Sequence, residues 1–248
     1  IAVSQFMKKD VHELYGVPLE KIRIIHNGID LNDYKPTFHP QILASYQINL
    51  KKPFILFVGR ITRQKGIVHL VNAIKYFCPG IQIVLCAGAP DTEEIGKEMT
   101  EKVKQAQTET ENEIIWISQI VPKDHIVNLY THAAIFVCPS IYEPFGIINL
   151  EAMACETPVV ASAVGGIQEV VVHNETGLLV PFEPQNSHNL EPRDPEQFSR
   201  DLASAINNLI SSPGRMHTMG IKSRERVEKY FSWNNIAKQT LEFYRDLT

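Results

Sequence analysis

The chain has 248 residues, of which 44% are hydrophobic and 21% charged, and its formal net charge is -4 at pH 7. This length fits one large or two small domains, and the composition is typical of a soluble globular protein. The negative charge argues against a broad nucleic-acid-binding surface, and no apolar run approaches the roughly 20 residues of a membrane helix. We therefore expect neither a nucleic acid nor a membrane as a partner.

The cysteine pattern predicts buried thiols and no metal site. None of Cys78, Cys86, Cys138 and Cys155 belongs to a Cys-x-x-Cys pair, and no His/Cys cluster has the spacing of zinc ligands. Three of the four lie in or beside apolar runs, where a free cysteine behaves as a small core residue. Unpaired structural thiols favour a reducing compartment, so we expect a cytoplasmic protein.

The first fifty residues predict a helix, a short strand and a linker. Residues 4–15 have a helical apolar stripe, with Ser4 as the N-cap and Gly16 at the end. Residues 21–25 predict a short strand, and residues 35–53 a polar linker with one short helix near a domain boundary. Because the sequence starts at Ile1 rather than at a methionine, we expect a fragment of a longer protein.

From residue 53 onward, short apolar strands alternate with helices. The expected strands are 54–58, 81–87, 113–117, 134–137, 159–161 and 177–180, and the expected helices between them are 67–77, 92–107, 124–131, 147–155 and 167–172. Such βαβ units with right-handed crossovers form a parallel sheet that is covered by helices on both faces. We therefore predict an α/β fold with a doubly wound parallel sheet, followed by a surface loop at 181–195 and three C-terminal helices.

The loop after the first strand of this sheet carries two cations. Arg60 lies one residue past the end of the strand, Lys65 stands at the entry to the next helix, and Gly59 and Gly66 allow sharp turns. An arginine fork and a lysine point charge at the carboxyl end of a strand suit a diphosphate. The alternative is a solvated basic loop. The loop lacks a Walker A sequence, and no Gly-x-Gly-x-x-Gly follows a strand, which argues against ATPase and dehydrogenase functions.

The segment from 138 to 162 predicts a second part of the same site. Gly146 precedes a helix, so the N–H groups of Gly146, Ile147 and Ile148 are available for a phosphate or a sugar hydroxyl. Glu143 can accept bonds from sugar hydroxyls, and Glu151 from a vicinal diol such as a ribose. The alternatives are that Glu143 only caps the helix and that Glu151 pairs with a surface cation. Apolar neighbours around Glu151 predict that it is partly buried.

Gly165 and Gly166 follow the next strand, where their backbone could approach the same ligand or could simply form a turn. The histidines show no pairing with a serine or cysteine nucleophile. We expect each of them on the surface or in a loop: His26, His69, His125, His132 and His173.

Four motifs stand together in this chain: Gly59-Arg60 with Lys65-Gly66, Glu143-x7-Glu151 with Gly146, Gly165-Gly166-Ile167-x-Glu169, and Asn174-x-Thr176-Gly177-Leu178-Leu179-Val180. With these motifs the chain resembles, from about residue 20 to its end, the donor-binding half of retaining GT-B glycosyltransferases of the glycogen-synthase-like family. Three further stretches, 87–93, 138–144 and 149–157, are similar to the short bacterial glycogen (starch) synthases that build α-1,4-glucan.

The resemblance implies roles for the residues already singled out. Arg60, Lys65 and Glu143 would be catalytic: the two cations would stabilise the leaving diphosphate, and Glu143 would contact the transferred sugar. Backbone N–H groups at the start of the helix would bind sugar or phosphate, and Glu151 would hold the ribose. The substrate-binding set implied is Gly59, Gly146, Ile147, Ile148, Glu151, Gly165 and Gly166. The reaction would retain the anomeric configuration and need neither a metal nor a cofactor besides the nucleotide sugar.

The resemblance also implies a division of the chain. Residues 1–30 would be the tail of an acceptor-binding domain that is otherwise missing, residues 31–230 a Rossmann-like donor domain, and residues 231–248 a helix that returns toward the missing domain. The donor would be ADP-glucose or UDP-glucose and the acceptor a glucan. We expect the fragment to bind nucleotide weakly and not to turn over. A sucrose-type synthase, a mannosyltransferase, a maltose-phosphate synthase and a non-catalytic nucleotide- or glycan-binding module are the alternatives.

Overall fold

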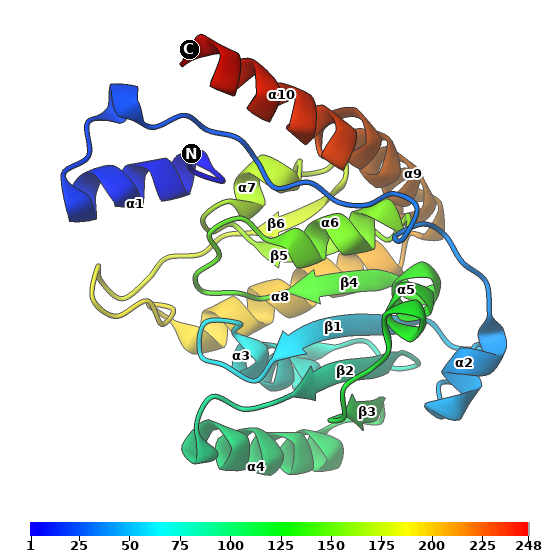
Figure 1. Cartoon of the computed structure of the whole chain (residues 1–248). Helices are drawn as coiled ribbons and strands as arrows, with labels where there is room; N and C mark the ends of the chain where they lie inside the picture. Colours follow the sequence, from blue (N-terminus) through cyan, green and yellow to red (C-terminus); the bar gives the residue numbers. More distant parts are fainter. Residues whose placement is uncertain (248) are drawn as a thin grey trace.

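The computed structural model describes residues 1–247 and contains a six-stranded parallel sheet in the order β3-β2-β1-β4-β5-β6 (Figure 1). Every pair of neighbouring strands is parallel. The strands are β1 (Phe54–Arg60), β2 (Gln82–Gly88), β3 (Glu113–Ile117), β4 (Ile135–Cys138), β5 (Val159–Ser162) and β6 (Gly177–Val180). The predicted doubly wound α/β fold is confirmed.

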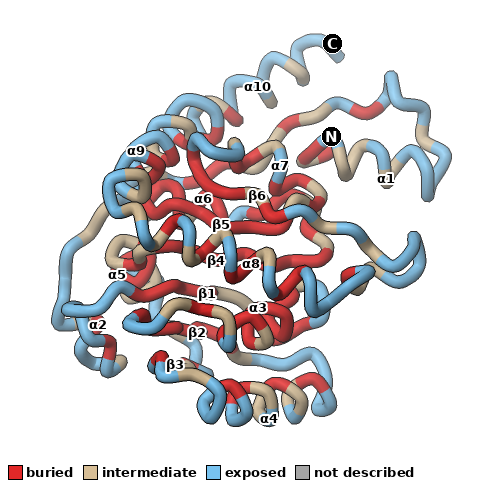
Figure 2. The backbone as a smooth tube through the Cα atoms, turned by 180° about the vertical axis from the view of Figure 1, so that it is seen from behind, coloured by how far each residue is buried: buried red, intermediate tan, exposed pale blue. Residues whose placement is uncertain are grey.

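Helices cover both faces of this sheet. One face packs against α3 (Ile67–Ala73), α4 (Glu93–Glu109) and α8 (Pro195–Ile210). The other packs against α2 (Pro40–Ser45), α5 (Lys123–His132), α6 (Ile147–Ala154), α7 (Ile167–Val170) and α9 (Pro213–Tyr230). Figure 2 shows that the buried residues concentrate on the strands between these two layers.

Strand β1 shows why its sequence is apolar throughout. Phe54 and Leu56 belong to the core on one face of the sheet, whereas Ile55 and Phe57 belong to the core on the other. Successive side chains of a strand point to opposite faces, so a strand that is covered on both sides needs apolar residues at every position. The same argument explains the apolar runs of β2 and β4.

The strand order places a topological switch point between β1 and β4. From β1 the chain proceeds outward to β2 and β3, and it then returns to β4 on the other side of β1. Crossovers therefore leave β1 and β4 in opposite directions, and ligands of open α/β sheets bind at the carboxyl ends of such strands. The arrowheads of β1 and β4 end at the same side of the molecule in Figure 1, where the loop of residues 139–146 lies.

The N-terminal segment differs in one respect from the prediction. The helix expected at 4–15 is present as α1 (Gln5–Tyr15), with Ser4 as its N-cap and Gly16 at its end. The strand expected at 21–25 is wrong: a 3-10 turn, η1 (Leu19–Lys21), is followed by a single parallel bridge between Ala2 and Ile24. Within residues 1–247 this segment pairs only with residue 2, and the chain enters α1 shortly after it, so the ladder does not grow.

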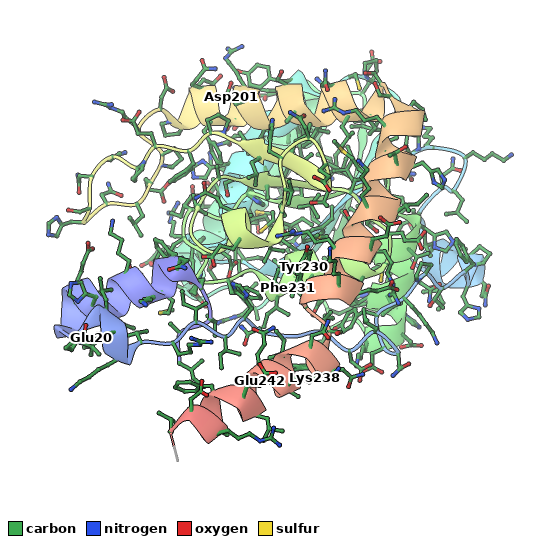
Figure 3. The ribbon with its side chains drawn as sticks, turned by 90° about the horizontal axis from the view of Figure 1, so that it is seen from above. Glu20, Asp201, Tyr230, Phe231, Lys238 and Glu242 are labelled. Atoms are coloured by element: carbon green, nitrogen blue, oxygen red, sulfur yellow. The ribbon has the colours of Figure 1, made fainter. Side chains whose placement is uncertain are left out.

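The last helix, α10 (Trp233–Asp246), leaves the body of the protein after Tyr230 and Phe231, which Figure 3 labels at the junction with α9. Ile29 anchors this junction, because its N–H donates to Phe231 O (2.8 Å) and its carbonyl accepts from Trp233 N (3.2 Å). These two bonds join the segment before the sheet to the junction of α9 and α10. None of the described helices is long and apolar enough to cross a membrane.

One histidine contradicts the expectation that all of them lie on the surface or in loops. His69 is in α3 and is only 6% exposed. Its ring packs edge-on against Phe198 of α8, and Nε2 lies 3.0 Å from Glu191 Oε2 of the loop 181–195. α3 packs against the sheet and against α8, which lies beside it on the same face, so most of its residues have little access to water. Burial accordingly lowers the pKa of His69.

Gly66, the residue before α3, should be essential for the packing of the loop after β1. Its φ is +62°, and a Cβ there would overlap the carbonyl oxygen of Pro139. We expect Gly66→Ala to lower the free energy of unfolding by at least about 3 kcal/mol, because it adds a backbone clash to the left-handed strain. Gly80 is the matched control: its φ is +91° but nothing lies within 4 Å of its Cβ position. Gly80→Ala should cost only about 1–2 kcal/mol in urea unfolding, and equal losses would contradict the role of the contact.

Candidate active site

The loops that follow β1, β4 and β5 meet at the carboxyl edge of the sheet. Ile141 N donates to Gln64 O (2.9 Å), which joins the loop after β4 to the loop after β1. Gly166 N donates to Glu143 O (3.0 Å), which joins the loop after β5 to the same segment. The three loops that the sequence singled out therefore form one continuous surface.

Lys65 and Glu143 form an ion pair at the centre of this surface. Lys65 Nζ donates to Glu143 Oε2 at 2.6 Å, and the two side chains are 24% and 9% exposed. Ser140 Oγ adds a longer bond of 3.4 Å to the same carboxylate oxygen. A charge-assisted bond that is partly shielded from water is stronger than an exposed ion pair, so both side chains are held in place. The structure thus brings together a cation and a carboxylate 78 residues apart in sequence.

The start of α6 lies beside this pair. Gly146 is the N-cap with a φ of +95°, and the cap has no side-chain hydrogen bond. Within residues 1–247, the N–H groups of Gly146, Ile147 and Ile148 have no hydrogen-bond acceptor. The N-terminal end of a helix carries partial positive charge and free donors, which suits an anion. The expected set of donors is therefore present next to Lys65.

Gly165 and Gly166 pack directly against the loop of Glu143. A side chain at Gly165 would overlap Glu143 O, and one at Gly166 would overlap Pro144 O. Both glycines therefore allow two loops of the protein to pack closely against each other. The sequence had left open whether they approach the ligand or form a turn.

Gly59 and Arg60 are the last two residues of β1, whereas the sequence had placed them in the loop that carries Lys65. The guanidinium of Arg60 pairs with Asp91, a residue to which the sequence analysis assigned no role, and the side chain is 66% exposed. Gly59 and Arg60 line a cavity of about 350 Å³ together with residues at the carboxyl ends of β2 and β3 and with one residue of α5. The residues of this lining are Val58, Gly59, Arg60, Cys86, Gly88, Ala89, Ser118, Gln119, Ile120, Val121 and Ile126. Arg60 thus stands between this cavity and the loop that carries Lys65.

Glu151 is held by two tyrosines rather than by a surface cation. Tyr34 Oη donates to Oε1 (3.0 Å) and Tyr130 Oη donates to Oε2 (2.9 Å). Burial raises the pKa of Glu151, and the two tyrosine bonds and Lys123 oppose that shift only in part. The predicted partial burial is confirmed. An ionised carboxylate has about four acceptor positions, so roughly two remain for another donor.

Neither tyrosine was predicted from the sequence as a partner of Glu151. Tyr34 comes from the segment before α2 and Tyr130 from the apolar face of α5, where a tyrosine looks like any other core residue. A phenol whose hydroxyl is buried needs a partner, and a carboxylate among apolar residues needs donors. That complementarity is the only signal in the sequence that could have linked them.

The N-terminal segment contacts the same site. Ser4 Oγ donates to Pro144 O (2.6 Å), and Tyr142 Oη donates to Asp10 Oδ2 (3.0 Å). Glu169 of α7 accepts the Gln5 N–H (2.8 Å), and its other carboxylate oxygen lies 3.1 Å from His26 Nε2. The first helix is therefore docked on the loop that carries Glu143.

Two family models match the chain: "Glycosyl transferases group 1" over residues 39–226 and "Glycosyltransferase Family 4" over residues 1–33. The chain is 44% identical over its whole length to the alpha-maltose-1-phosphate synthase of Mycolicibacterium smegmatis, of which it covers 63%. Two solved structures have the same fold. Sucrose-phosphate synthase of Thermosynechococcus elongatus has a TM-score of 0.80 and 32% identity, with 99% of this chain and 57% of that one covered.

The second structure is Anabaena Alr3699/HepE, solved in complex with UDP-glucose. It has a TM-score of 0.80 and 25% identity, with 99% of this chain and 63% of that one covered. The chain thus spans less than two thirds of each of these three relatives. The first family model matches most of the chain. The fold of the chain and its identity to the synthase agree with this match. The chain belongs to the group 1 glycosyl transferases, which have the GT-B fold.

Proposed function

We propose that this chain is the nucleotide-sugar-binding part of a retaining hexosyltransferase that uses ADP-glucose or UDP-glucose. The contact between Lys65 and Glu143 at the start of α6 carries this proposal. It places a cation for phosphate, a carboxylate for sugar hydroxyls and free backbone donors within one surface at the switch point of the sheet.

The donor diphosphate would lie between Lys65 and the N-terminus of α6. An ammonium group has three donors, and Glu143 takes one of those of Lys65, so two remain for phosphate oxygens. Arg60 can turn its exposed fork from Asp91 toward the same phosphates. When the bond between the anomeric carbon and the diphosphate oxygen breaks, these preplaced charges stabilise the negative charge that develops on the leaving group.

The nucleoside would extend from there across the ends of β1, β2 and β3. The cavity beside Gly59 and Arg60 is of a size that suits a nucleobase, and it opens next to the proposed diphosphate site. Glu151 keeps acceptor positions for the ribose diol while the two tyrosines hold it in place. The complex of HepE with UDP-glucose, a protein with the same fold, supports this assignment.

For the acceptor we propose α-glucose 1-phosphate, so that the product is maltose 1-phosphate and a nucleoside diphosphate is released. The 44% identity to a maltose-1-phosphate synthase supports this choice. The second candidate is the end of an α-1,4-glucan, as the motifs at 138–144 and 149–157 suggest. In both cases the acceptor hydroxyl forms the new glycosidic bond on the face that the diphosphate leaves, and its proton passes to the departing diphosphate.

The division of the chain remains part of this proposal. Residues 1–30 would belong to an acceptor-binding domain, residues 31–230 to the donor domain, and residues 231–248 to a helix returning toward the first. The separate family match at residues 1–33 and the docking of α1 on the Glu143 loop support it.

Replacing Lys65 should test the diphosphate site. We expect Lys65→Ala to weaken the binding of UDP or ADP at least about tenfold in isothermal titration calorimetry, since a charge-assisted contact to phosphate is lost. Arg60→Ala should weaken it as well. The matched control is Arg63→Ala in the same loop, because Arg63 pairs with Glu98 of α4, away from Glu143. Unchanged affinity in Lys65→Ala, or equal losses in all three variants, would refute the assignment.

The acceptor can be identified in the full-length protein by its product. With UDP-glucose and ADP-glucose as donors, we expect α-glucose 1-phosphate to yield a disaccharide phosphate that is resistant to β-glucosidase, detected by mass spectrometry. Glycogen primer should give at least about tenfold less incorporation of labelled glucose. Preferential elongation of glycogen would instead establish the glucan synthase, and absence of transfer with either acceptor would contradict both proposals.

The buried carboxylate of Glu151 should make stability depend on pH. Its pKa is raised by burial, so its ionisation opposes folding above the unfolded value of about 4.3 and this cost fades as the pH falls. We expect the free energy of unfolding of the wild type, relative to that of Glu151→Gln, to increase as the pH falls from 7 to about 4.5. Urea unfolding at a series of pH values measures this difference. A constant difference would show that folding leaves the pKa of Glu151 unchanged, and the opposite trend would show that the tyrosine bonds stabilise the ionised form instead.

A further inference from the structure

Asn149 is a buried polar residue that the proposed function does not use. Its side chain is 0% exposed, and neither Oδ1 nor Nδ2 has a hydrogen-bond partner in the part of the chain that the structure describes. Burying an amide without partners is unfavourable, and an apolar side chain of similar shape would serve stability better. Violations of this kind concentrate at functional sites, so the position of Asn149 is informative.

Asn149 is the third residue of α6, and its carboxamide lies against Gly146. Nδ2 is 2.6 Å from the point that a Cβ of Gly146 would occupy, and Glu143 Cγ and Ile167 Cγ1 are both 3.4 Å from the same point. The amide therefore sits between the loop of Glu143 and the start of α7, directly behind the first turn of α6.

A polar side chain at the third helical position often reaches back to the N–H of the N-cap residue, as in a capping box. Here the N-cap is Gly146, which supplies no side chain of its own to the cap. A half-turn of the Asn149 amide exchanges Oδ1 and Nδ2 and turns an acceptor toward Gly146. The N–H of Gly146 lacks an acceptor among the described residues, so donor and acceptor complement each other.

We propose that Asn149 is a positioning residue of the donor site: its carboxamide accepts the Gly146 N–H and fixes the first turn of α6. The N–H groups of Ile147 and Ile148 are then the ones that point at the phosphate or sugar of the donor. Gly146 has a left-handed conformation without a Cβ to restrict it, so this turn needs an additional contact to hold its direction.

This inference rests on the proposed function, because its readout is the binding of a nucleotide sugar. The variant to compare is Asn149→Leu in the full-length protein, which removes the amide at nearly constant volume. We expect a melting temperature within about 3 °C of the wild type, because the loss of the one bond from the Gly146 N–H is offset by the removal of an unpartnered amide group from the core. The dissociation constant for UDP-glucose or ADP-glucose, measured by calorimetry, should rise at least about fivefold, because the helix start is no longer held in the binding geometry.

Asn128 provides the matched control. It is 1% exposed, but its Oδ1 accepts from His39 N (2.8 Å) and its Nδ2 donates to Asp124 O (2.9 Å). Asn128→Leu should lower the melting temperature by more than about 5 °C and leave the affinity of the folded protein unchanged. A purely structural role of Asn149 would give the same pattern as Asn128, whereas a positioning role separates affinity from stability.

Each outcome decides the question. If the wild type binds neither nucleotide sugar, the proposed function fails and this inference fails with it. If the wild type binds and Asn149→Leu binds equally well, only the role of Asn149 fails. Asn149→Ala is a second variant that removes the amide without the bulk of leucine. It should weaken binding to a similar degree. A loss of stability in both Asn149 variants as large as that in Asn128→Leu would overturn the proposal.

Discussion

The site depends on the ion pair between Lys65 and Glu143. These residues come from loops after β1 and β4, the two strands at which the crossovers diverge, so nothing in the local sequence holds them together. Once the pair is partly withdrawn from water, removal of either partner leaves the other charge poorly solvated. The loop of Pro139 touches Gly66 at the same junction, which requires a glycine there. The geometry of the site is thus fixed by long-range contacts between two loops.

Helix α6 shows that this region is arranged for more than stability. It is a short core helix with Leu150, Ala152 and Met153 fully buried, yet it also carries a buried carboxylate and an unpartnered buried amide. Both polar groups reduce the stability that an all-apolar helix would have at this place. They lie on the helix whose N-cap, Gly146, packs against Glu143. Buried polar residues that lower the stability of the fold are expected where a protein binds its ligand.

The sequence was sufficient to predict the parallel sheet and the meeting of the three loops at one edge of it. Apolar strands that are buried on both faces have few alternatives, and the loops at their carboxyl ends must lie at one edge. It was insufficient where one partner lies far along the chain. The tyrosines that bind Glu151 are 117 and 21 residues away, and Asp91 is 31 residues from Arg60. The misplaced strand at 21–25 and the buried His69 have the same origin, because burial and pairing depend on neighbours that local patterns do not reveal.

The contacts of α1 connect the N-terminal segment to the loop of Glu143. Ser4 is bound to Pro144 and Tyr142 to Asp10, on either side of Glu143, while Glu169 holds the first N–H groups of the helix. The N-terminus of α1 carries partial positive charge, so the carboxylate of Glu169 is well placed to stabilise it. Any displacement of residues 1–30 must break these bonds or move the loop of Glu143 with them. The position of the carboxylate that pairs with Lys65 is therefore coupled to the segment that precedes the sheet.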